Sequence, residues 1–141
     1  MKRTASALWS GTLKDGQGSL SSPSGVFKQT PYSFRSRFGD GGETNPEELI
    51  AAAHAGCFSM ALSNILGKAN LNPERIATTA NLDFDQVDGA WTIKAIHLDL
   101  IAKVPGIDQA KLESLANEAK LNCPVSRVLK AEITMSAKLE K

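Results

Sequence analysis

The chain of 141 residues has only two cysteines, 66 positions apart, and neither of its two histidines has partners spaced for a zinc site. Its formal net charge is +1, with acids and bases interspersed, which argues against a nucleic-acid surface or a polybasic membrane segment. It contains no nucleotide-binding loop, no dinucleotide glycine pattern and no Gly-x-Ser-x-Gly elbow. The two cysteines therefore become the first place to look for chemistry.

The first residues carry two positive charges, Lys2 and Arg3, but no sustained apolar run follows them. We therefore expect no signal peptide. Two cysteines without a secretion signal are typical of a protein whose thiols stay mostly reduced, so any disulfide would be transient and functional. We expect a cytoplasmic protein that binds neither membrane nor nucleic acid.

One long segment, Leu49 to Gly67, has no formal charge and approaches the length of a membrane-spanning helix. It contains polar residues such as His54 and Asn64, and much of the remainder is alanine or glycine. We therefore expect a helix that is buried on most sides inside a soluble protein. Its small residues would let another backbone approach closely.

Turn signals and alternating apolar residues predict strands up to Phe34, followed by a flexible glycine-rich loop at 38–42. Asn45 and Pro46 favour the start of the long helix. Two long strands then follow, joined by a turn at Asp88 and Gly89. A shift in their apolar phase predicts a bulge near Ala95 and Ile96 that keeps one face buried.

In the last third, Asp108 is placed to cap an amphipathic helix. Its inward residues are predicted to be Leu112, Leu115, Ala116 and Ala119. Pro124 restarts a short helix, and a final strand alternates from Ala131 to Leu139. This order of elements predicts an α+β fold with largely antiparallel sheets around long central helices. No linker divides the chain, so we expect residues 1–141 to form a single domain.

Cys57 lies in the middle of the long helix, about ten residues from the N-terminal dipole. A thiol must be ionised to act as a nucleophile, so Cys57 would need a cation from elsewhere in the fold. Arg35 and Arg37 are the candidates. One charge at about 4 Å and an effective dielectric of about 20 contributes roughly 4 kcal/mol, or about three pKa units. The alternative is that both arginines are solvated residues at a strand end.

Cys123 precedes Pro124 and is predicted to be the N-cap of the short helix, where free N–H groups would favour a resolving thiolate. His54 lies three residues before Cys57, near the same helical face. It is either a base or, as is more common for a lone histidine, a hydrogen-bonded core group. Both cysteines are open to the alternative that they are inert and buried.

Two segments resemble the OsmC/Ohr family, whose names denote osmotically inducible protein C and organic hydroperoxide resistance protein. They are residues 44–62, TNPEELIAAAHAGCFSMAL, and residues 122–126, NCPVS. The likeness extends to residues 32–38 and 87–89. The region before the long helix is more similar to the OsmC branch than to the Ohr branch.

The resemblance implies a thiol-dependent peroxidase that reduces hydroperoxides, organic ones especially, as an intertwined homodimer without a cofactor or metal. By motif position, Cys57 would be the peroxidatic cysteine and Cys123 the resolving cysteine. Arg37 would be the activating arginine and Glu47 its carboxylate partner. A dithiol, for example a lipoylated protein, would be the reductant.

Glu47 and Cys57 are ten residues apart, so one helix would separate them by about 15 Å. An antiparallel pairing with the same helix of a second copy would bring Glu47 of one chain toward Cys57 of the other. We therefore expect two sites across a dimer interface. The alternatives are a redox sensor in which the disulfide is a switch, and a hydrophobic-ligand-binding protein with inert cysteines.

Overall fold

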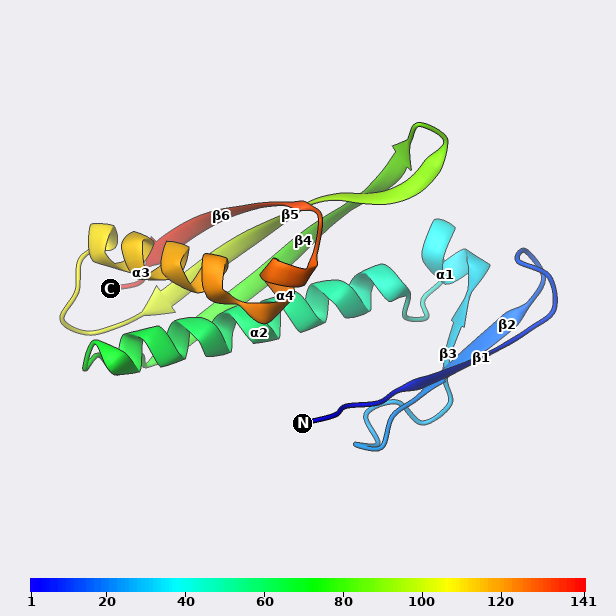
Figure 1. Ribbon diagram of the computed structural model, residues 1–141, viewed down its shortest axis with the longest axis horizontal. Coiled ribbons are helices and arrows are strands. Elements are labelled where there is room, and N and C mark those ends of the chain that lie inside the picture. Colours follow the sequence, from blue (N-terminus) through cyan, green and yellow to red (C-terminus); the bar gives the residue numbers. More distant parts are fainter. The chain divides into compact units, whose positions relative to one another are not determined.

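The computed structural model describes residues 1–141, which form six strands and four helices (Figure 1). The chain divides into two compact units, residues 1–49 and 50–141. Each unit has its own three-stranded sheet. The predicted α+β class is therefore confirmed, whereas the single domain 1–141 stays a prediction.

The N-terminal unit is an antiparallel meander in the order β1-β2-β3. Its strands are β1 (Ser6–Ser10), β2 (Gln17–Ser21) and β3 (Thr30–Ser33). Gly18 in the central strand pairs with Trp9 on one side and Tyr32 on the other. A Cβ at this position would lie 2.4 Å from the Tyr32 ring, so only glycine lets the two aromatic side chains close over the sheet.

A short helix, α1 (Phe34–Phe38), replaces the end of the strand that the sequence predicted. Ser33 caps it, because its hydroxyl accepts from the Ser36 N–H and the Ser36 hydroxyl accepts from the Ser33 N–H. This pair of serines is a capping box without the usual glutamate or glutamine, so its sequence does not have the usual signature of a helix start. As a result, Arg35 and Arg37 are helical residues rather than residues at a strand end.

The long helix α2 (Pro46–Lys68) begins as predicted, and the Asn45 side chain accepts from the Glu48 N–H at 2.8 Å. Its length and composition alone would let it cross a membrane. Its core-facing residues are Phe58, Leu62, Ile65 and Leu66. The opposite face is exposed within the single chain, at Ala53, Gly56, Met60, Ser63 and Gly67. The prediction of a helix buried on most sides is therefore wrong for one chain.

The C-terminal unit has a mixed sheet in the order β4-β5-β6. Strands β4 (Arg75–Val87) and β5 (Ala90–Lys103) are antiparallel, and β6 (Glu132–Leu139) runs parallel to β5. Asp83 pairs with Ala95 and Phe84 with Ile93, so Lys94 is the extra residue of a bulge. The bulge lies next to Ala95, one residue before the predicted position.

Two helices cross from β5 to β6, α3 (Gln109–Asn122) and α4 (Pro124–Val128). Asp108 caps α3 by accepting from the Lys111 N–H at 2.8 Å. The four residues predicted to face inward are all buried. Together with α2 and one face of the sheet, they form a single hydrophobic core that also contains Cys123. The connection from β5 to β6 through α3 and α4 thus places Cys123 beside α2.

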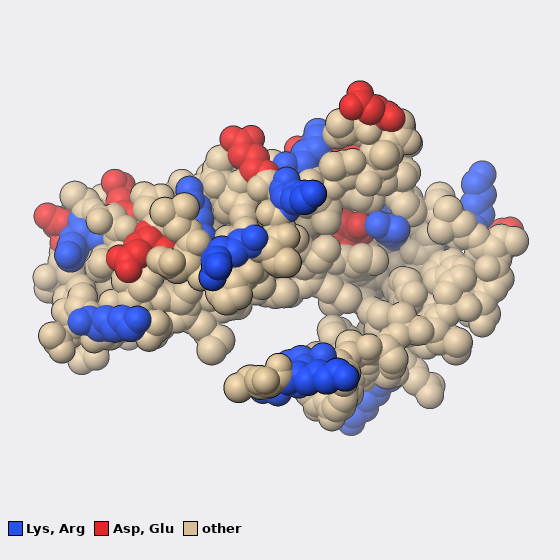
Figure 2. Space-filling view, viewed as in Figure 1, with Lys and Arg blue, Asp and Glu red and all other residues tan.

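Charged side chains of both signs are interspersed over the face shown in Figure 2, without a large patch of one sign. Several acids and bases pair across neighbouring strands, for example Lys94 with Asp85 at 3.1 Å. This distribution agrees with the formal net charge of +1.

Candidate active site

The two cysteines meet in the C-terminal unit, although 66 positions separate them in the sequence. Their Sγ atoms are 3.0 Å apart and share a hydrogen bond, and both are free thiols. Cys123 is fully buried, whereas Cys57 is half-buried. A disulfide bond is about 2.05 Å long, so an approach of about 1 Å would join the two sulfurs.

Cys123 is fixed by the two helices that meet at it. Its N–H donates to the Ala119 carbonyl and closes α3, and its own carbonyl accepts from the Arg127 N–H in α4. Pro124 occupies the first position of α4, as the sequence predicted. The Cys123 side chain makes no capping hydrogen bond to α4, so its sulfur is directed to Cys57 rather than to the helix end.

The pKa of Cys57 is raised above its ordinary value, first by burial and then by the hydrogen bond with Cys123. A backbone hydrogen bond from Val125, in the first turn of α4, acts in the opposite direction and lowers this pKa. None of these groups is a cation. No cation therefore acts on the Cys57 thiol, and the Val125 N–H is the one group that favours its ionised form.

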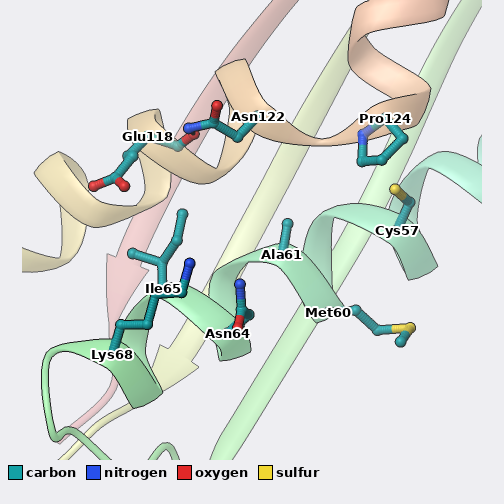
Figure 3. Close-up of a pocket in the computed structure, with 9 residues that line it drawn as sticks. All are labelled: Cys57, Met60, Ala61, Asn64, Ile65, Lys68, Glu118, Asn122 and Pro124. Carbon is teal, nitrogen blue, oxygen red and sulfur yellow. Dashed lines mark hydrogen bonds between the residues drawn. The ribbon is translucent and has the colours of Figure 1, made fainter.

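Cys57 also lies on the wall of an open groove of about 770 Å³ beside α2, α3 and the start of α4. Figure 3 shows its sulfur directed toward Pro124, with Met60 and Asn64 further along α2. The lining residues are Cys57, Met60, Ala61, Asn64, Ile65, Lys68, Glu118, Asn122 and Pro124. The groove leaves Cys57 accessible along this side of the helix, and its walls are both apolar and polar.

Arg37 and Glu47 form a bidentate ion pair in the N-terminal unit. The Arg37 Nε donates to both carboxylate oxygens at 3.2 Å, and Nη2 donates to Oε1 at 2.9 Å. The Glu47 side chain is only 11% exposed. The guanidinium also lies over the Phe38 ring, with its central carbon 5.1 Å from the ring centroid. Such a doubly bonded arginine has a fixed orientation.

Arg35 has a different partner, Asp40, at 3.2 Å. Both side chains of this pair are largely exposed, at 76% and 93%. An exposed ion pair of this kind holds its members weakly. Of the two arginines that the sequence proposed, only Arg37 is held in a partly buried setting.

A smaller pocket of about 250 Å³ opens beside Arg37. Its walls are mostly aromatic and apolar, and consist of Trp9, Leu13, Tyr32, Ser33, Phe34, Arg37, Phe38 and Pro46. The Phe34 and Phe38 rings pack with their centroids 4.9 Å apart. A cation in a pocket with this lining suits a substrate that is apolar with one polar end.

His54 is fully buried, and its Nε2 lies 2.7 Å from the Ser126 Oγ in α4. Burial lowers the pKa of His54 below its ordinary value. This geometry fits the hydrogen-bonded core group rather than the base. The Ser126 contact was missed because 72 positions separate the two residues and no local pattern connects them.

A family model described as "OsmC-like protein" matches residues 39–138. The chain is 50% identical over 134 residues to the protein named "Peroxiredoxin OsmC" of Escherichia coli, covering 95% of this chain and 94% of that protein. It is 32% identical to the "Organic hydroperoxide resistance protein" of Xanthomonas axonopodis pv. citri, covering 78% of this chain and 75% of that protein.

The fold is similar to solved structures of the same group. The crystal structure of the organic hydroperoxide resistance protein OhrB of Bacillus subtilis aligns with a TM-score of 0.65 and 26% sequence identity. The alignment covers 97% of this chain and 98% of that one. The match thus spans both the N-terminal and the C-terminal unit.

Proposed function

Because the chain belongs to the OsmC family, we propose that it is a thiol-dependent peroxidase that reduces organic hydroperoxides through a Cys57–Cys123 disulfide cycle. The observation that carries this proposal is the distance of 3.0 Å between two free cysteine sulfurs from separate elements. The names of the relatives in Escherichia coli and Xanthomonas support the same activity. No metal or organic cofactor enters the proposed cycle.

In the first step, the Cys57 thiolate attacks the distal oxygen of the hydroperoxide. A sulfur–oxygen bond forms as the oxygen–oxygen bond breaks, and the leaving alkoxide takes a proton to become an alcohol. Two electrons pass from sulfur to the peroxide, so Cys57 becomes a sulfenic acid. Most of the acceleration comes from positioning, since ionisation alone multiplies the nucleophile only by tens at neutral pH.

In the second step, the Cys123 thiolate attacks the Cys57 sulfur, and hydroxide leaves with a proton as water. The product is a Cys57–Cys123 disulfide. A dithiol, a lipoylated protein for example, then attacks this disulfide and restores both thiols while its own sulfurs become oxidised. Each full cycle therefore consumes one hydroperoxide and one dithiol.

We assign the ionisation of Cys57 to Arg37, with Glu47 holding the guanidinium. The neighbours of Cys57 in its own unit include no cation, and its pKa there is raised. Arg37 has the fixed orientation that a transition-state charge requires, and it would also stabilise the departing oxygen. The apolar pocket beside Arg37 would favour organic hydroperoxides over hydrogen peroxide.

We further propose that the active sites lie between two copies of the chain. Helix α2 includes both Glu47 and Cys57, which its rise separates by about 15 Å. Its exposed residues Ala53, Gly56, Met60, Ser63 and Gly67 recur at spacings of three and four, as in helices that pack on another helix, and all but Met60 are small. A Cβ added at Gly56 or Gly67 would meet no atom within 4 Å, so this face is uncovered. We propose that helix α2 of a second copy of the chain packs on this face.

Two further expectations remain part of this proposal. The whole chain, residues 1–141, would act as one domain, and the protein would work in the cytoplasm. The second point rests on the sequence, since a chain with only two cysteines is typical of a compartment that keeps thiols reduced.

Peroxide consumption tests the function directly. With cumene hydroperoxide and excess reduced dihydrolipoamide, the wild-type protein is expected to consume many equivalents of peroxide per chain. Cys57→Ser should abolish this turnover. Consumption of a single equivalent would indicate a redox switch instead, and no consumption would indicate inert cysteines.

A further inference from the structure

We propose that the hydrogen bond between His54 and Ser126 positions Cys123 for disulfide formation with Cys57. This inference rests on the proposed peroxidase cycle, in which Cys123 must reach Cys57 once the latter is oxidised. The bond joins α2 to α4, and the cysteine pair joins α2 to the N-cap residue of α4. Ser126 is thus a positioning residue that acts through the placement of Cys123.

The two contacts involve residues with the same spacing on each side. His54 precedes Cys57 by three residues on α2, and Ser126 follows Cys123 by three residues on α4. Residues three apart in a helix lie on neighbouring turns. Two adjacent bridges therefore link α2 to this segment, one between sulfurs at 3.0 Å and one between His54 Nε2 and Ser126 Oγ at 2.7 Å.

Helix α4 packs on the core only through partly buried apolar residues such as Val125. It is five residues long and none of them is fully buried. Apart from the two hydrogen bonds of the Cys57 sulfur, with the Cys123 thiol and the Val125 N–H, the side-chain hydrogen bond between α2 and residues 123–129 is the one from His54 to Ser126. When Cys57 is oxidised, its hydrogen bond with the Cys123 thiol is lost or altered. The His54–Ser126 bond then remains to hold α4 against α2.

The chemistry of His54 suits a permanent bridge. Its Nδ1 is buried and has no hydrogen-bond partner. A proton on Nδ1 would leave a buried donor unsatisfied, which favours a neutral ring with its proton on Nε2. The Nε2–H then donates to the Ser126 hydroxyl oxygen. Burial, which lowers the pKa of His54, keeps this arrangement at neutral pH.

Ser126→Ala tests the proposal because it removes one oxygen atom from α4 and leaves both cysteines in place. Losing one neutral hydrogen bond should lower the effective concentration of Cys123 about threefold to tenfold. We expect the rate of sulfenic acid resolution to fall by that factor, with more Cys57 sulfinic acid at high peroxide. The rate of the first attack on peroxide should stay within about twofold of wild type.

A second measurement does not depend on peroxidase activity. In mixtures of oxidised and reduced glutathione, the fraction of the Cys57–Cys123 disulfide reports the effective concentration of Cys123 at equilibrium. Ser126→Ala should shift this equilibrium about threefold to tenfold toward the dithiol. This holds even for a protein that fails to turn over peroxide, so the two proposals fail separately.

Two further variants show whether Ser126 specifically positions Cys123 or whether the loss of any hydroxyl contact of α2 has the same effect. Ser126→Thr keeps the hydroxyl and should restore the wild-type equilibrium and resolution rate. Ser59→Ala removes another hydroxyl contact of α2, to the Thr78 Oγ1 at 2.8 Å in β4, and should leave both quantities unchanged. The proposal is overturned if Ser126→Ala matches wild type in the glutathione equilibrium, or if Ser59→Ala shifts it equally.

Discussion

Arg35 and Arg37 are two positions apart in α1 but differ in how firmly they are held. Arg37 makes three hydrogen bonds to the carboxylate of Glu47, whereas Arg35 has one exposed contact with Asp40. If Arg37 stabilises the Cys57 thiolate, the alanine variants of the two arginines should differ in peroxidase activity. Arg37→Ala should lower kcat/KM for cumene hydroperoxide by about 10²–10³, because a preorganised charge is lost. Arg35→Ala should stay within about twofold.

The same two variants can also be compared by the pKa of the Cys57 thiol. Without Arg37, the pKa of Cys57 should be raised, in the direction that burial imposes. The rate of iodoacetamide labelling at Cys57 should then keep rising above pH 8 in Arg37→Ala. In Arg35→Ala and wild type it should level off at lower pH. Identical labelling profiles in all three proteins would contradict the role of Arg37.

The burial of His54 leads to a separate prediction about how the free energy of unfolding depends on pH. Because burial lowers its pKa from 6.5, the unfolded chain takes up a proton at a higher pH than the folded chain. The free energy of unfolding should therefore fall as pH decreases below about 6.5, until the folded-state pKa is reached. The slope for one proton is at most about 1.4 kcal/mol per pH unit.

Urea unfolding between pH 7.5 and pH 5 measures this slope, and His54→Gln should remove the part due to His54. Glutamine does not titrate and can still donate to Ser126. His97→Gln removes the other histidine and serves as the control, since the contribution of His54 persists in it. An unchanged slope in His54→Gln would show that other groups cause the acid sensitivity.

At the scale of secondary-structure elements, the proposed dimer depends on the exposed face of α2. Ser63 lies on this face, six residues beyond Cys57, and is exposed in the single chain. Ser63→Arg should leave the fold of one chain intact but place a charge between two packed helices. Sedimentation velocity should then show a monomer where the wild type shows a dimer.

Asn117→Arg provides the matched control for that experiment. Asn117 is exposed on α3, outside the α2 face, and takes the same new charge. It should leave the dimer unchanged. A dimer that survives Ser63→Arg would show that α2 does not pack on its symmetry mate.

The comparison of elements also explains what local sequence could predict. Periodic helices such as α3 and turn-bounded strands such as β4 and β5 were found because their signals lie within a few residues. Helix α1 was missed because Tyr32 and Phe34 alternate like a strand, while the serine capping box is unusual. The exposed face of α2 was misjudged because composition shows that a helix is apolar, not which of its faces is buried.

The site itself was predictable only in part, for a related reason. The cysteine pair and the ion pair of Arg37 were expected from motif positions, and both contacts are present. The choice between Arg37 and Arg35 could not be derived from residue type, since it depends on which carboxylate lies within reach. The contacts of Val125 and Ser126 depend on how α4 meets α2, which no local pattern encodes.

For the molecule as a whole, the decisive question is whether Glu47 and Cys57 of one site come from the same chain. Heterodimers of a Glu47→Ala chain and a Cys57→Ser chain answer it. If a site combines the two chains, both changes fall in one site and the other stays intact, so about half of the wild-type activity remains. If each site uses one chain, both sites are damaged and activity is nearly lost.

The matched control places both changes in one chain and pairs it with a wild-type chain. Its expected results are reversed: a shared site leaves almost no activity, and a site within one chain leaves about half. Differential affinity tags isolate each heterodimer before the peroxide assay. The shared site predicts half activity in the first heterodimer and little in the second. The opposite pair of results would place each Arg37–Glu47 pair with the Cys57 of its own chain and remove the functional reason for the dimer.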